Sequence, residues 1–259
     1  MIISVINHTS LQDTTVNEVI RAINRQIIDD FSPNWSLGAT LRLEGKSSKK
    51  PSASSIADMR GDAILYLLDE VDVEDALGYH DTNFRGIPYS FVFRELSEKL
   101  GEEWTVTFSH EALEMIADPE VNLLVAGPHP SNPKKEVFHW YEMCDAVQSE
   151  TYKVDGVEVS NFVLPLYFTV SDEKGSRNDF MNRKHNGATL KSFGVNPGGY
   201  CGFFDPATGD HDTFSADEKA KKRREIKAQA RTARRGIRYQ QPHIVAPPRR
   251  VAKAAKSGR

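Results

Sequence analysis

The chain has 259 residues, of which 39% are hydrophobic and 27% charged, a composition typical of a large globular domain or of a domain with an appendage. Its net charge of −3 conceals an asymmetry: residues 217–259 hold 15 basic and 3 acidic side chains, a net of +12, which leaves −15 for the rest. No stretch approaches the ~20 apolar residues of a membrane span, and the first residues lack a signal-peptide pattern. Two cysteines are too few for a disulfide framework. We therefore expect a cytoplasmic protein with no membrane partner.

In the first hundred residues, short apolar runs alternate with one amphipathic helix. The helix is predicted over residues 16–30, because its apolar residues are spaced by three and four, and Thr14 or Thr15 is its expected N-cap. Apolar or alternating runs predict strands over residues 2–6, 39–43, 63–68 and 89–93. Lys- and Ser-rich or acidic segments predict loops over residues 45–55 and 71–86.

The middle of the chain combines alternating and helical patterns. Residues 104–108 alternate like a strand, and Ser109 is then the expected N-cap of a helix that Pro119 should end near Asp118. Residues 121–139 contain three prolines and are predicted to be irregular. A hairpin is predicted over residues 152–159, turning at 155–156, followed by an extended segment over 162–170.

The basic C-terminal part differs in kind from the rest. Residues 216–235 have a helix-forming composition without a large apolar face, and from Gln240 onward the Pro, Ala, Lys and Arg content predicts disorder. We therefore divide the chain into a domain over 1–215 and a basic tail over 216–259. The tail would bind nucleic acid through its phosphates, without sequence preference, or hold a partner protein subunit.

Three chemically active side chains lie on the predicted helix that follows residue 108, in the order His110-Glu111-Ala-Leu-Glu114. Residues four apart share one face of a helix, so His110 and Glu114 can bind one metal ion. Glu111 lies about 100° around the helix, as does the general base of the His-Glu-x-x-His metallopeptidases. The pattern therefore predicts a metal site in which Glu114 replaces the second histidine and Glu111 is catalytic.

A catalytic zinc site needs a third protein ligand. Glu142 is the favoured candidate, and Asp118 is an alternative that an unbroken helix would place about 12 Å along from His110. Asp145 is expected to orient His110 from behind or to serve as another alternative ligand. Cys144 is a softer potential ligand that we interpret as a small buried apolar residue.

These residues carry a resemblance to a known class of enzymes. The segment from Trp104 to Glu114 resembles the edge strand and active-site helix of zincin-fold peptidases, and a downstream glutamate is similar to the gluzincin arrangement. Several stretches also resemble an uncharacterised zincin-like family of bacteria and their phages, and the resemblance spans roughly residues 1–205. The stretches are 24–26 with 30–35, 77–81, 86–88, 109–119, 142–145 and 159–165. The resemblance implies an α+β, zincin-like domain with a mixed sheet packed on an active-site helix, and a metal site.

Two further features bear on the chemistry. His80, in the acidic segment before residues 89–93, is a candidate to bind substrate or stabilise an oxyanion, or else a surface-loop histidine. Two glutamate ligands would largely neutralise a zinc ion and weaken it as a Lewis acid, and an oxygen-rich site would also suit Ca²⁺ or Mn²⁺.

Two functions follow as hypotheses. The first is a metal-dependent, zinc-preferring hydrolase, specifically a peptidase in which Glu111 takes a proton from metal-bound water. The second is an inactive zincin-like structural or accessory protein, such as a phage-particle component packaged with its partner, whose basic tail anchors it to nucleic acid or to another subunit.

Overall fold

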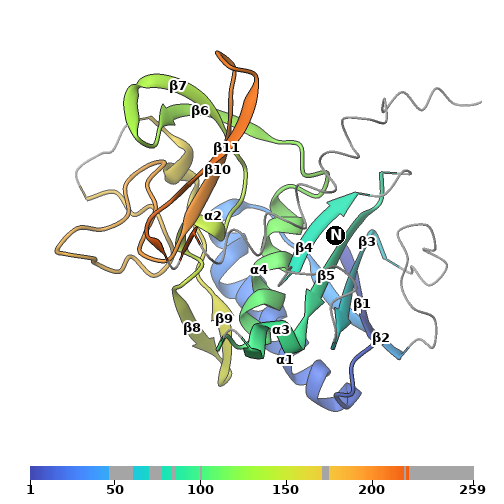
Figure 1. The fold of residues 1–259 in the computed structure, drawn as a ribbon. Helices are drawn as coiled ribbons and strands as arrows, with labels where there is room; N and C mark the ends of the chain where they lie inside the picture. The colour runs from blue at the N-terminus through green and yellow to red at the C-terminus, as the bar shows by residue number, and fades with distance from the viewer. Residues whose placement is uncertain are drawn as a thin grey trace, which may run out of the picture.

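The computed structural model describes residues 1–46, 61–69, 78–82, 86–99, 101–170, 175–218 and 220–221. It is a mixed α/β structure. Two long helices, α1 (Asp13–Arg25) and α4 (Trp104–Ala117), lie beside a five-stranded sheet, and a second sheet and a hairpin lie beyond α4 (Figure 1). None of the helices in this part of the chain combines the length and apolar character that a bilayer crossing requires.

The first sheet has the strand order β2-β1-β3-β5-β4. Its strands are β1 (Ile2–Asn7), β2 (Thr40–Lys46), β3 (Ala63–Leu68), β4 (Gly78–Thr82) and β5 (Pro88–Phe93). Neighbouring strands from β2 to β5 are parallel, whereas β4 is antiparallel to β5. The four parallel strands confirm the predicted strands: β1, β3 and β5 are largely buried and read as apolar runs, whereas β2 alternates between buried and exposed residues at the edge of the sheet.

Strand β4 lies inside the segment that we predicted to be a loop over residues 71–86, and that prediction is wrong for residues 78–82. The segment Gly-Tyr-His-Asp-Thr contains a single large apolar residue, so its sequence lacks the alternation of a strand. Residues 70–77 and 83–85, which include most of the acidic run, are outside the described residues, as is most of the predicted loop over 45–55.

The first helical region is longer than predicted and changes its geometry. Helix α1 begins at Asp13, with Gln12 at the N-cap in place of Thr14 or Thr15. It continues into the π-helix η1 (Gln26–Phe31) and then α2 (Ser32–Trp35), which ends where Ser36 adopts a φ of 55°. The apolar face of α1 packs on β2 and on the β8–β9 hairpin, so the predicted amphipathic helix is confirmed although its ends differ.

Helix α4 corrects the sequence prediction for residues 104–108, which we expected to be a strand. The short helix α3 (Arg94–Lys99) precedes it, and α4 then runs unbroken from Trp104, with Glu103 at the N-cap and Ser109 in its middle. All 14 residues of α4 are buried. A helix that is buried on every side has no polar stripe, so its sequence lacks the 3.6-residue period. In residues 104–108, Trp, Val and Phe alternate with Thr, and this alternation resembles that of a strand.

The second half of the described chain is largely antiparallel. A four-stranded sheet has the order β11-β10-β7-β6, with β6 (Leu124–His129), β7 (Asn132–Trp140), β10 (Tyr200–Asp205) and β11 (Asp210–Ser215). The prediction of irregular structure over 121–139 is therefore wrong. Pro128 and Pro133 lie near the turn end of the β6–β7 pair, where the register shifts and a proline is tolerated.

The remaining elements lie in the chain between β7 and β10, two neighbouring strands of the second sheet. The hairpin of β8 (Thr151–Val154) and β9 (Val157–Ser160) turns at Asp155 and Gly156, both at positive φ, which confirms its prediction. Short 3-10 helices are η2 (Asp145–Val147) and η3 (Pro165–Phe168), and the latter corrects the extended segment that we predicted over 162–170.

One core holds the first sheet, α1, α4 and the segment after β7 together. Phe31, Phe108 and Phe162 are among its largest fully buried side chains, and each contributes about 1.5–3 kcal/mol through burial. Residues on α4 and residues 143–147 share this core, which places the beginning of that segment beside the helix. Residues 222–259, most of the basic tail, are outside the described residues.

Candidate metal centre

Helix α4 brings two of the predicted metal ligands together. The Nε2 atom of His110 lies 3.1 Å from Oε1 of Glu114, one helical turn away. The exposed fraction is 3% for His110 and zero for Glu114. Glu111, the predicted proton carrier, lies on the same turn as His110 and is also fully buried.

The segment that follows β7 supplies the other candidate ligands. Oδ1 of Asp145, at the start of η2, lies 3.3 Å from the same Nε2 atom of His110. The backbone N–H of Cys144 donates to Oε1 of Glu114 at 3.2 Å, and its thiol approaches the carbonyl of His110 at 3.8 Å. His110, Glu114 and Cys144 offer donor atoms that all lie within 4.8 Å of one another. Glu142 is buried in the same segment.

The charges in this cluster act strongly on Glu114. Burial raises the pKa of Glu114 to about 7; the imidazole of His110 opposes the shift, whereas the nearby carboxylates of Asp145 and Glu142 reinforce it. Three carboxyl groups thus lie close enough to interact around one imidazole. Such crowding of like charges inside a protein is costly unless a cation is present.

The donor set fits a metal ion. Tetrahedral zinc with bonds of about 2.0–2.1 Å has ligand atoms separated by roughly 3.3 Å, and the two carboxylate oxygens lie 3.1 and 3.3 Å from the His110 nitrogen. A residue that only orients a ligating histidine contacts the other ring nitrogen. Asp145 instead meets the nitrogen that faces Glu114, whereas the three side chains whose donor atoms all converge are His110, Glu114 and Cys144.

Two other predicted site residues, Asp118 and His80, lie at the end of α4 and on a neighbouring strand. Asp118 is at the C-cap of α4, where its Oδ2 accepts the backbone N–H of Leu123 at 2.9 Å and closes the turn after the helix. The backbone of His80 is in β4, opposite Ser90 of β5, and not in a loop. Strand β4 packs against α4, so the backbone of His80 belongs to an element that adjoins the site helix.

The two histidines near the site in sequence have structural roles. His139 is buried, its Nε2 lies 2.9 Å from the carbonyl of Pro128, and burial lowers its pKa. His129 accepts the N–H of Ser131 at 3.1 Å and packs edge-on against Phe203.

A second buried polar cluster was not predicted from the sequence. We call it the amide network, because Asn161 and Asn196 bind the carboxylates of Glu150 and Asp179 within it. Asn161 donates to Glu150 at 2.8 Å and to Asp179 at 2.9 Å, and Asn196 donates to Glu150 at 2.7 Å. His185, at the rim, lies 2.5 Å from Glu150. The only sequence signal was asparagine within otherwise apolar segments such as Ser160-Asn-Phe-Val-Leu.

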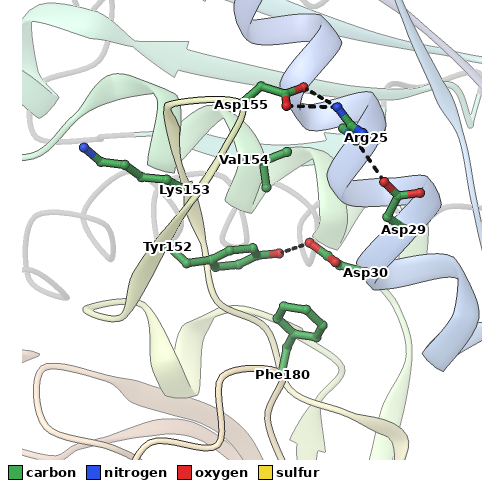
Figure 2. Close-up of a pocket in the computed structure, with 8 residues that line it drawn as sticks. All are labelled: Arg25, Asp29, Asp30, Tyr152, Lys153, Val154, Asp155 and Phe180. Carbon is green, nitrogen blue, oxygen red and sulfur yellow. Dashed lines mark hydrogen bonds and ion pairs between the residues drawn. The ribbon is translucent and has the colours of Figure 1, made fainter.

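A cavity of about 320 Å³ lies apart from the metal centre, between η1 and the β8–β9 hairpin (Figure 2). Arg25 at its edge is paired with Asp155 at 2.9 Å and with Asp29 at 3.3 Å, and the hydroxyl of Tyr152 donates to Asp30 at 2.8 Å. None of the predicted site residues lines it. Its acidic groups are already bound to Arg25 or Tyr152, so the metal centre is the better candidate for chemistry.

Comparison of the chain with protein-family models, with curated proteins and with solved structures gave no match.

Proposed function

We propose that the protein is a metal-dependent hydrolase, with zinc as the preferred metal, and that it acts as a peptidase with a zincin-like arrangement. The observation that carries the proposal is the convergence of Glu114 and Asp145 on one nitrogen of His110. A buried imidazole between carboxylates is a donor set that zinc prefers, and Ca²⁺ or Mn²⁺ are the alternatives if oxygen donors dominate.

Each residue has a distinct role in this proposal. His110 and Glu114 would hold the metal from α4, and Asp145 and Glu142 would supply the remaining oxygen donors from the segment after β7. When bound, the metal would polarise a water molecule and stabilise negative charge on the substrate carbonyl. Glu111 takes the proton of that water and passes it to the leaving amine, which requires a carboxylate beside the metal ligands.

The sheet supports a peptide substrate and the zincin-like assignment. Strand β4 is the edge of the mixed sheet, antiparallel to its neighbour, and it packs against the site helix. Within the described ranges β4 pairs with β5 alone. An edge strand can bind an extended peptide by adding it to the sheet, so β4 is placed to present a substrate along α4. His80, on this strand, keeps its proposed role in substrate binding.

A second candidate function has its own observation. Glu111 and Glu114 are fully buried and His110 is 3% exposed, which is expected of a metal that stabilises a fold more than of one that keeps an open position. Under this alternative the protein is an inactive zincin-like accessory component, for example of a phage particle. Its basic tail would then hold nucleic acid or a partner subunit.

The deciding experiment is elemental analysis of the purified protein beside two single variants. We expect about one equivalent of zinc in the wild type, its loss in Glu114→Ala, and its retention in Glu111→Gln with loss of metal-dependent peptide hydrolysis. Metal in the wild type with no hydrolysis of any peptide library would favour the accessory function. If the wild type contains no metal, or if Glu114→Ala retains the metal, the site is neither a catalytic nor a structural metal site.

A further inference from the structure

Gln26 is a polar side chain inside an apolar interface. It is the first residue of the π-helix η1 and is fully buried, and the neighbouring Ile23 and Ile27 belong to the main core. An amide in such a place must have its hydrogen bonds satisfied, or its burial would oppose folding. The partners of Gln26 therefore show what the residue holds in place.

The amide of Gln26 connects three elements. Its Oε1 accepts a hydrogen bond from the hydroxyl of Ser109 on α4 at 2.7 Å. Its Nε2 donates to the carbonyl of Ser160 on β9 at 2.8 Å and to the hydroxyl of Tyr152 on β8 at 3.1 Å. The oxygen and both N–H groups of the amide are thus engaged, and each bond leads to an element that adjoins the metal centre or the cavity in Figure 2.

Ser109 does not follow the usual behaviour of a serine within a helix. Such a serine commonly donates back to the carbonyl four residues earlier in its own helix. Here its hydroxyl donates to Gln26 and accepts the backbone N–H of Ser160 at 3.2 Å. Ser109 is fully buried and immediately precedes His110, so these two bonds fix the turn of α4 that carries the metal ligand.

The rotation of α4 about its axis is the quantity that these bonds control. Side-chain atoms lie about 5–6 Å from a helix axis, so a rotation of about 10° moves them by roughly 1 Å. Metal–ligand distances tolerate about 0.2 Å. Apolar contacts are non-directional and do not set an angle so closely, whereas the hydrogen bond that Ser109 donates to the fixed amide of Gln26 does. One turn further along α4 from His110, Glu114 accepts a hydrogen bond from the backbone N–H of Cys144.

We propose that Gln26 is a positioning residue for the metal centre, which sets the rotation of α4, and with it His110, through Ser109. The inference rests on the proposed metal site and adds a residue from an element that contributes no ligand. The π-helix that begins at Gln26 agrees with such a role, because π-helical turns are often found near functional sites.

The test compares three single variants in the full-length protein. Gln26→Met removes the amide at similar volume, Ser109→Ala removes its partner, and Thr105→Ala is the matched control. Thr105 is also on α4 and also binds the hairpin, through the carbonyl of Glu158 at 2.7 Å. Zinc affinity is measured by competition with a chelator, and thermal stability is measured without metal.

We expect Gln26→Met and Ser109→Ala each to weaken zinc binding about tenfold, as loss of an outer-shell partner does. Thr105→Ala should lower the melting temperature similarly and leave the zinc affinity within about twofold. The double variant of Gln26 and Ser109 should bind no more weakly than the weaker single variant, because both act through one bond. Equal losses in Gln26→Met and Thr105→Ala, or additive losses in the double variant, would overturn the proposal.

A second measurement separates this proposal from the proposed function. If the wild type binds no metal, the metal assignment fails, and the ring signals of His110 in NMR spectra of the metal-free protein decide on positioning. A shift of these signals in Gln26→Met, absent in Thr105→Ala, supports positioning; unchanged signals overturn it. If Gln26→Met does not fold, Ser109→Ala replaces it in both measurements.

Discussion

The metal centre and the amide network are both built from buried carboxyl groups, but they meet different partners. In the amide network, Asn161 lies between Glu150 and Asp179 and donates to each. In the metal centre, Glu114 and Asp145 approach a single nitrogen of His110, and the pKa of Glu114 rises to about 7, chiefly through burial. Burial is therefore common to both clusters, and the kind of donor facing the carboxylates separates a structural network from a candidate metal site.

The largest expected effect tests the amide network. Asn161→Ala should lower the free energy of unfolding by about 3–5 kcal/mol, because it removes the donor that Glu150 and Asp179 share and leaves each buried carboxylate with one hydrogen bond fewer. Urea denaturation measures this loss. Asn122→Ala is the control, since Asn122 binds Glu120 at the exposed surface, and it should change the stability by less than about 0.5 kcal/mol. A loss below about 1 kcal/mol in Asn161→Ala would show that the asparagine does not stabilise the carboxylates of the amide network, and the contrast with the metal centre would then fail.

The next effect concerns the ligands of the metal centre. Asp145→Asn should weaken zinc binding by roughly 100-fold and Glu142→Gln by roughly tenfold, because both are proposed oxygen donors and the carboxylate of Asp145 lies 3.3 Å from Nε2 of His110. Isothermal titration measures both. The reverse order would assign the third ligand to Glu142, as the sequence alone favoured, and Asp145 to an orienting role.

The smallest effect is a pH-dependent gain in stability. The pKa of Glu114 is raised to about 7 in the folded protein from an ordinary value of 4.5, so its protonated form favours folding below about pH 4.5 and that contribution is lost as the pH rises through 7. In metal-free protein, Glu114→Gln should therefore raise the unfolding free energy by about 1–3 kcal/mol at pH 8 and leave it unchanged near pH 4.5.

The same variant should have the opposite sign in the presence of zinc, because it removes a ligand. Thermal unfolding at the two pH values, with and without metal, measures both effects. If the stability of Glu114→Gln equals that of the wild type at every pH, ionised Glu114 does not destabilise the metal-free protein. The carboxylates of the metal centre would then be as well satisfied as those of the amide network.

The sequence predicted the parts of the molecule whose environment is simple. The parallel strands β1, β3 and β5 are largely apolar because both faces are covered, and His110 and Glu114 meet because a helix brings residues four apart together. It failed where tertiary packing overrides local pattern: residues 104–108 are helical because α4 is buried on every side, and β6–β7 forms despite its prolines.

The partners of the site helix were beyond sequence reasoning for a different reason. The hydrogen bond between Gln26 and Ser109 joins residues 83 positions apart, and no local period or spacing relates them. Asp145 was singled out, but only the structure shows which nitrogen of His110 it meets. Contacts of this range depend on how the elements assemble and leave no signature in a single chain.

The complete burial of α4 has a consequence for the lifetime of a bound ion. An ion held by side chains that are at most a few per cent exposed leaves only when the surrounding segments separate, so its residence time is set by an opening reaction of the domain. Exchange with added isotope would then be slow even for a metal bound with modest affinity. The ion would bind before the segment around Asp145 closes over the helix at the end of folding. The metal content of a preparation would therefore reflect the ions that were present while the chain was being made.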